Sequence, residues 1–116
     1  MKIVYVDEKP GDSSDSLLML LSLCGHDVTL VTDYKDAMPL IIMNQPDVIL
    51  TRIYTATRSL PFDLMGQLKT DYSFDLVRVA ILNTTLGTNR EMALAAGFDR
   101  VLTVPVAPEE LFEAIV

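Results

Sequence analysis

Charged and hydroxyl side chains follow several short apolar runs of the chain, and these groups are the most able to do chemistry. Two acids, Asp7 and Glu8, close the first run, and a cation, Arg52, lies at the end of the third. A threonine-rich loop around Gly87 could bind an anion, although capping the next helix is the more frequent use of such hydroxyls. No glycine-rich phosphate loop or nucleophile elbow accompanies these groups, so nucleotide binding and hydrolysis have no support.

Five apolar runs are typical of buried strands, and helical patterns separate them. The predicted strands cover residues 2–6, 27–32, 47–51, 79–82 and 101–104, and the predicted helices cover residues 16–24, 33 or 36–43, 62–69, 89–96 and 108 onward. Pro39 is compatible with the second helix only in its first turn, where backbone amides lack partners. The alternation predicts right-handed βαβ crossovers and a parallel sheet with helices on both sides. The loops after the first, third, fourth and fifth strands then meet at the carboxyl edge, where ligands bind.

The composition excludes several functional classes. A chain of 116 residues suits a single domain with one core. Its net charge of −7 repels phosphate backbones and anionic lipids, so this domain is not expected to bind nucleic acid or a membrane directly. No apolar stretch is long enough for a secretory signal or a membrane span, and we expect a cytoplasmic protein. The single cysteine, Cys24, and the methionines at helical positions are expected in the core; these are Met19, Met38, Met43, Met65 and Met92.

Three segments together resemble the receiver domain of two-component response regulators, and the resemblance covers residues 2–116. The first is the acidic pair after Val6. Gln45 to Leu50 is similar to the segment that delivers the family's phosphoacceptor aspartate, and Ala96-Gly97-Phe98-Asp99, with the next strand and Pro105, resembles the family's final segment. The resemblance implies one domain over residues 1–116 with a doubly wound (βα)5 flavodoxin-like α/β fold, a three-layer sandwich whose five parallel strands lie in the order 2-1-3-4-5. Because the last helix is short, we expect the chain to be excised from a longer protein.

The chemistry of the resembled family is phosphoryl transfer to an aspartate beside a divalent metal. Along the resemblance the acceptor position falls on Arg52, the hydroxyl position on Asn83, and the lysine position on Val104, which Pro105 follows. A guanidinium stays protonated at any relevant pH, so it is neither a nucleophile nor a metal ligand. The resemblance therefore implies a pseudo-receiver that is not phosphorylated on aspartate and that needs no cofactor, with its Mg²⁺ site disabled.

The remnant of the site consists of Asp7 and Glu8 opposite Arg52, on neighbouring strand ends. Opposite charges in a partly buried cleft attract, which predicts an internal ion pair in place of a metal. The alternative is that Arg52 points to solvent while the two acids cap the following turn, because exposed ion pairs are weak.

The leading functional hypothesis is a non-enzymatic signalling module that binds another protein. In the resembled family, the face formed by the fourth helix, fifth strand and fifth helix commonly carries partners or dimers, and residues 89–95 and 106–112 form that stretch here. One alternative is a functioning phosphorelay regulator with a relocated acceptor such as Asp7 or Asp99. Another is a flavodoxin-like domain that binds a small molecule at the carboxyl edge, although the first loop carries acids and Pro10 instead of a phosphate-binding glycine run.

Overall fold

The computed structural model describes residues 1–54, 63–64, 66, 76–82 and 87–115 of the chain. The strands are β1 (Lys2–Val6), β2 (Asp27–Val31), β3 (Val48–Ile53), β4 (Val77–Leu82) and β5 (Arg100–Thr103), and the helices are α1 (Asp12–Leu23), α2 (Tyr34–Asn44), α4 (Gly87–Ala96) and α5 (Pro108–Ile115). The strands form one parallel sheet in the order β2-β1-β3-β4-β5. This arrangement confirms the predicted fold class and strand order.

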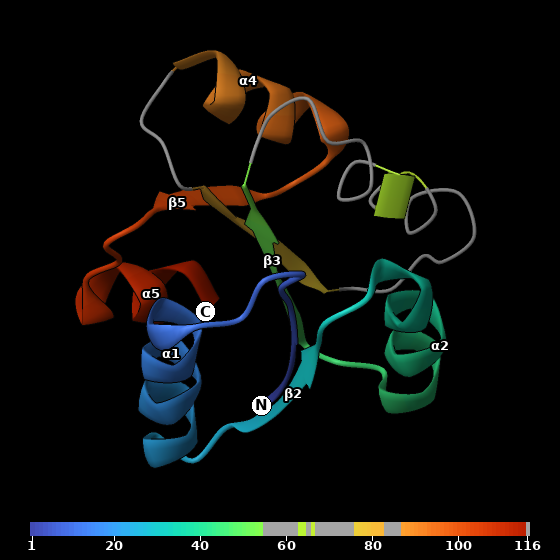
Figure 1. Cartoon of the computed structure of the whole chain (residues 1–116), viewed down its shortest axis with the longest axis vertical. Helices are drawn as coiled ribbons and strands as arrows, with labels where there is room; N and C mark the ends of the chain where they lie inside the picture. Colours follow the sequence, from blue (N-terminus) through green and yellow to red (C-terminus); the bar gives the residue numbers. More distant parts are fainter. Residues whose placement is uncertain (55–62, 65, 67–75, 83–86, 116) are drawn as a thin grey trace.

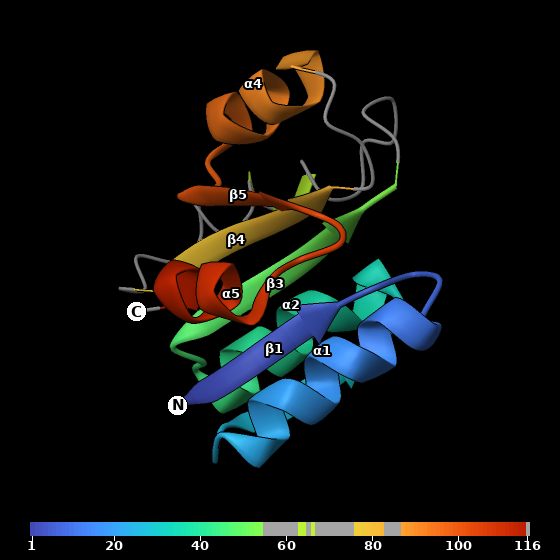
Figure 2. The ribbon, with the colours of Figure 1, turned by 90° about the vertical axis from the view of Figure 1, so that its left-hand side faces the viewer.

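Helices cover both faces of the sheet, with α1 and α5 on one face and α2 on the other (Figures 1 and 2). Successive side chains of a strand point to opposite faces, so each strand contributes to two cores. Ile3 and Tyr5 of β1 pack in the core beneath α1 and α5, whereas Val4 and Val6 pack in the core that α2 and α4 cover. The same alternation directs the next residue, Asp7, toward the α1 and α5 side at the end of β1.

The start of α1 differs from the prediction. The helix begins at Asp12, four residues before the predicted start at residue 16, and Gly11 is its N-cap in an extended conformation. Ser14 lies inside the first turn and is buried. The earlier start therefore places the Ser14 hydroxyl next to the end of β1.

The end of α1 corrects the prediction for Cys24, which is exposed and not part of the core. Leu17 and Leu21, one helical turn apart, form the buried face of α1. The helix ends at Leu23 and the chain turns at Gly25, where φ is +87°. Cys24 is the C-cap residue, beyond the last residue of the helix, and its side chain stays exposed.

The position of Pro39 also differs from the prediction. The Asp33 side chain caps α2 by accepting a hydrogen bond from the Lys35 amide at 3.0 Å, so the helix begins at Tyr34. Pro39 then lies beyond the first turn, inside the helix, and it removes one backbone hydrogen bond there. The helix accommodates it because Pro39 faces solvent.

Three of the five methionines that were expected in the core are exposed, so the prediction is wrong for them. The three are Met19, Met43 and Met92. Met38 is partly buried against the core, and Met65 lies outside the described residues. The predicted helix over residues 62–69 also lies mostly outside them, although residues 63–64 and 66 are helical and Leu64 is buried. Within the described ranges, no helix has the length and apolar character needed to cross a bilayer.

Candidate functional site

The carboxyl ends of β1 and β3 bring Asp7 and Arg52 together. Val6 pairs with Thr51 in the parallel register, so the next residue of each strand lies at the same edge of the sheet. Both side chains continue the alternation that faces α1 and α5. Asp7 is fully buried and Arg52 is only 5% exposed. The prediction that these two residues meet at the carboxyl edge is therefore consistent with the register of the strands.

Asp7 accepts hydrogen bonds on both of its carboxylate oxygens. The Lys9 amide donates to Oδ1 at 2.9 Å, and the Tyr54 hydroxyl donates to the same oxygen. The Ser14 hydroxyl donates to Oδ2. A buried carboxylate is costly unless donors compensate it, and hydrogen bonds to a charged acceptor are stronger than neutral ones. These donors come from three segments, so Asp7 joins the first loop, α1 and the end of β3.

Tyr54 follows β3 directly, and its hydroxyl also lies 2.7 Å from the Lys9 carbonyl oxygen. Two cations lie near its ring: the Arg52 Cζ atom is 5.3 Å and the Lys9 Nζ atom 5.7 Å from the ring centre. Burial raises the pKa of the Tyr54 phenol, and the hydrogen bond to the Asp7 carboxylate and its charge raise it further. The phenol therefore stays protonated and remains a donor at neutral pH.

Both the backbone and the side chain of Arg52 have contacts that hold them in place. Its backbone carbonyl accepts a hydrogen bond from the Tyr34 hydroxyl of α2 at 3.3 Å, and its guanidinium faces the Tyr54 ring. Burial raises the pKa of Tyr5, and the neighbouring Arg52 and Ser14 oppose that rise. The burial of Arg52 argues against the alternative in which this side chain points to solvent. The ion pair of Arg52 with Asp7 or Glu8 stays a prediction.

The other positions singled out in the sequence are less closely associated with Asp7. Val104 is half-buried after β5, and with Pro105 and Leu17 it lines a hollow of about 360 Å³ between α1 and the segment that follows β5. Glu8 is half-buried beside Asp7. Asn83 lies outside the described residues, as does most of the threonine-rich loop.

A divalent cation does not fit the residues present at this edge. Such a cation needs several oxygen ligands with free lone pairs. Asp7 already accepts three hydrogen bonds, and the neighbouring strand end carries the Arg52 guanidinium. Among the residues that the structure describes, no three His, Cys, Asp or Glu side chains are placed to hold a metal ion. The site is a buried carboxylate satisfied by protein donors.

Ser14 and Tyr54 are the two site residues that were not predicted. A helix start four residues earlier would have placed Ser14 in the first turn of α1, close to the acidic pair. Tyr54 carries a weaker signal, since a tyrosine two residues after a buried arginine is equally compatible with an exposed loop. Both omissions follow from uncertainty about element boundaries.

This combination of a β2-β1-β3-β4-β5 parallel sheet, helices on both faces and an acidic first-strand end defines the fold of a response-regulator receiver domain. The chemotaxis protein CheY4 of Vibrio cholerae superposes with a TM-score of 0.77 at 19% identity, over 97% of this chain and 92% of the other. A response regulator from Desulfuromonas acetoxidans has the same TM-score and identity, over 97% and 90%. A third match is the co-crystal structure of the Saccharomyces cerevisiae histidine phosphotransfer protein Ypd1 with the receiver domain of Ssk1. Its TM-score is 0.79 at 16% identity, over 99% of this chain and 86% of the other.

A relative in sequence is an uncharacterised 14.6 kDa protein of Leptolyngbya boryana, from the sodA1 3′ region. It is 28% identical over 116 residues, which span 99% of this chain and 87% of the relative. No protein-family model matches the chain. The receiver fold is therefore established by the structure, whereas the activity has to be argued from the site.

Proposed function

We propose that the chain is a cytoplasmic pseudo-receiver that acts in signal transduction by binding a protein, without enzymatic activity and without aspartyl phosphorylation. The observation that carries the proposal is the position of Arg52. It is buried at the edge where the resembled family has its acceptor carboxylate, beside an Asp7 whose oxygens accept hydrogen bonds from protein groups. A protonated guanidinium has no lone pair with which to attack phosphorus.

The proposed docking surface is the face formed by α4, β5 and α5. A groove of about 430 Å³ crosses it. Apolar side chains from α4 and β5 line the groove, among them Leu94, Val101 and Leu102. Charged side chains from both helices also line it, among them Arg90, Glu110 and Glu113. Leu94 and Met92 of α4 are each nearly half exposed. Apolar area bordered by charges of both signs suits a protein interface of modest size.

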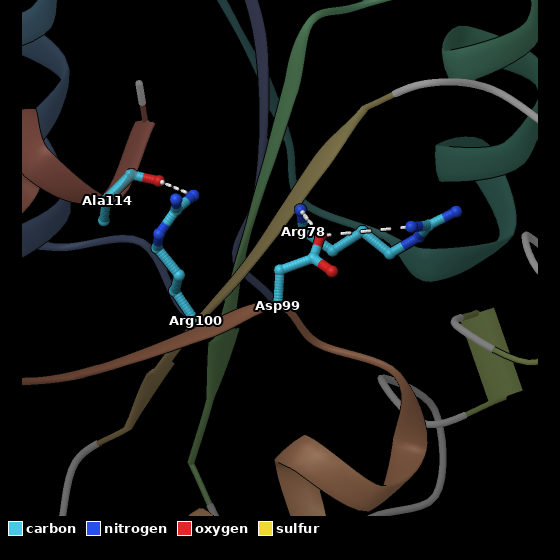
Figure 3. Close-up of polar contacts among 4 residues, drawn as sticks. All are labelled: Arg78, Asp99, Arg100 and Ala114. Atoms are coloured by element: carbon cyan, nitrogen blue, oxygen red, sulfur yellow. Dashed lines mark hydrogen bonds and ion pairs between the residues drawn. The ribbon is translucent and has the colours of Figure 1, made fainter.

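Polar contacts stabilise the amino edge of this face (Figure 3). Asp99 Oδ2 accepts a hydrogen bond from the Arg78 amide at 2.8 Å and lies 3.9 Å from Arg78 Nη1. Arg100 Nη1 donates to the Ala114 carbonyl at 2.9 Å, close to the end of α5. A guanidinium at a helix C-terminus satisfies a free carbonyl and complements the helix dipole. Both contacts hold β5 against its neighbours, which favours a preorganised groove.

The occupant of the groove is a partner protein or a second copy of the chain. Arg90 of α4 and the acids of α5 have opposite signs, so a two-fold axis could pair them between copies. Among the structural neighbours, the yeast co-crystal structure joins a receiver domain to a phosphotransfer protein. Both kinds of occupant are compatible with a receiver fold that lacks its own acceptor.

Incubation with Mg²⁺ and acetyl phosphate, or with beryllofluoride, tests the loss of phosphorylation. Intact mass and amide NMR shifts are the readouts, and a receiver with an intact acceptor is the positive control. We expect no adduct and no saturable shift. An acid-labile adduct would overturn the proposal and support a regulator with a relocated acceptor, which peptide mapping would assign to Asp7, Asp99 or another residue. Arg52→Asp, measured alongside, shows whether a carboxylate at this position is sufficient.

Sedimentation velocity of two matched variants tests the docking face for a second copy. Leu94→Asp places a charge in the groove, whereas Met19→Asp places the same charge on an exposed apolar position of α1. Dimerisation lost only in the Leu94 variant supports the α4–β5–α5 face. Dimerisation that survives in the Leu94 variant would place the interface elsewhere. If the parent chain is a monomer at every concentration, the occupant of the groove is a different protein.

A further inference from the structure

Tyr54 contacts one of the two carboxylate oxygens through which Asp7 could bind a cation. A carboxylate oxygen offers about two lone-pair directions. On Asp7 Oδ1 the Lys9 amide, at 2.9 Å, and the Tyr54 hydroxyl use both of them. The Lys9 amide belongs to the turn that follows Asp7 itself. Tyr54 reaches Asp7 from the position directly after β3, the strand on which the resembled family carries its third metal-binding carboxylate.

Several contacts hold Tyr54 in this place. Its hydroxyl lies 2.7 Å from the Lys9 carbonyl, and its ring lies 5.3 Å from Arg52 Cζ and 5.7 Å from Lys9 Nζ. These contacts come from the loop after β1 and from β3, so the ring cannot leave Asp7 without breaking interactions with both segments.

We propose that Tyr54 is an internal plug that closes the acidic pair to divalent cations separately from the charge of Arg52. The inference rests on the proposed function and adds a second determinant to it. Arg52 opposes a cation by repulsion of like charges, whereas Tyr54 opposes it by occupying one of the two Asp7 oxygens, the other of which accepts a hydrogen bond from Ser14. A substitution at one position leaves the other barrier in place, so a carboxylate at residue 52 alone restores only weak cation binding.

Magnesium titrations of four variants test the plug, with amide NMR shifts and broadening by Mn²⁺ at Asp7 and Glu8 as readouts. The variants are Arg52→Asp, Tyr54→Ala, and the double variants that combine Arg52→Asp with Tyr54→Ala or Tyr54→Phe. We expect the parent and Tyr54→Ala to show no saturable binding and Arg52→Asp to bind weakly. Both double variants are expected to bind roughly tenfold more tightly than Arg52→Asp, the size expected when one competing hydrogen bond to a charged group is removed.

A matched control separates this effect from the loss of any buried hydroxyl. Tyr34→Phe removes a phenol that donates to the Arg52 carbonyl at 3.3 Å, and in the Arg52→Asp background it is expected to leave cation affinity unchanged. Equal affinity of Arg52→Asp and both folded double variants would overturn the plug while leaving the proposed function intact. Saturable Mg²⁺ binding at Asp7 in the parent chain would overturn both. The Tyr54→Phe double variant keeps the ring, so the test survives if the alanine variant does not fold.

Discussion

Neutralising Asp7 is expected to destabilise the protein, and the sign of this effect separates a donor-filled site from an acidic pocket. In an acidic pocket, removing one of several like charges relieves repulsion and stabilises the fold. Here Asp7 is fully buried and accepts hydrogen bonds from Lys9, Ser14 and Tyr54. Its removal leaves these donors without their acceptor and a buried arginine with less compensating charge.

The magnitude follows from which donors can find another partner. Lys9 is exposed, so its amide can bond to water, and the Tyr54 hydroxyl keeps the Lys9 carbonyl. Ser14 is 2% exposed, so its hydroxyl cannot turn to water. We expect Asp7→Ala to lower the free energy of unfolding by about 3 kcal/mol, which is about a 10 °C fall in Tm for a domain of this size. Asp7→Asn is expected to cost about 1 kcal/mol, because its amide can still bond to the Ser14 oxygen.

Urea unfolding followed by circular dichroism measures both values, compared at constant m-value. Asp15→Asn is the matched control, since Asp15 is an exposed acid on α1, and it is expected to change stability by less than about 0.5 kcal/mol. An Asp7→Asn variant that is more stable than the parent would refute the reasoning. It would mean that repulsion between acids, and not satisfaction of donors, dominates this edge of the sheet.

Three further outcomes follow from other contacts. The folded pKa values of Tyr5 and Tyr54 are raised above the ordinary 10.0, so the stability that these two phenols contribute is complete below pH 10 and falls as the pH rises further. Absorbance at 295 nm should therefore show that some tyrosines of the folded protein lose their proton above pH 10. Titration of all tyrosines together near pH 10 would contradict this. Arg100→Met removes the hydrogen bond to the Ala114 carbonyl, and we expect a cost of about 1 kcal/mol and faster amide exchange in α5, whereas unchanged exchange would argue against this role. Pro39→Ala restores a backbone donor inside α2 and should raise stability by about 1 kcal/mol, while a lower Tm would show that the ring itself stabilises the helix.

The strands could be predicted because their apolar runs are interrupted by few polar residues, and the errors lie where charged residues enter a strand. β4 begins at Val77, two residues before the predicted start, since Arg78 breaks the apolar run. That charge is tolerated because the Asp99 carboxylate lies beside it. β3 continues to Ile53 through Arg52 for a related reason, because local contacts hold the buried cation. Such compensation depends on tertiary partners, which a linear pattern does not contain.

The candidate site could be predicted only in part. Asp7 and Arg52 follow from strand ends in a parallel sheet, where position along the chain largely determines position in space. Ser14 and Tyr54 depend on the first residue of α1 and on the path of the chain after β3, and element boundaries are the least certain part of such predictions. The residues that satisfy Asp7 were therefore missed although the carboxylate itself was identified.

The uncharged side chain of Val104 is compatible with a positive charge on Arg52. In the resembled family, a lysine after the fifth strand binds the negative phosphoryl product, but with Arg52 in the chain a lysine there would bring a second cation to the same edge. Val104 instead lines an apolar hollow with Leu17 and Pro105, packed toward the core beneath α1 and α5. In the proposed function, no negative product forms at this edge, so apolar packing replaces the lysine without loss. In the proposed function, the arginine, the valine and the Tyr54 contact to Asp7 each disable a different part of the family's site, so restoring any single family residue is not expected to restore the chemistry.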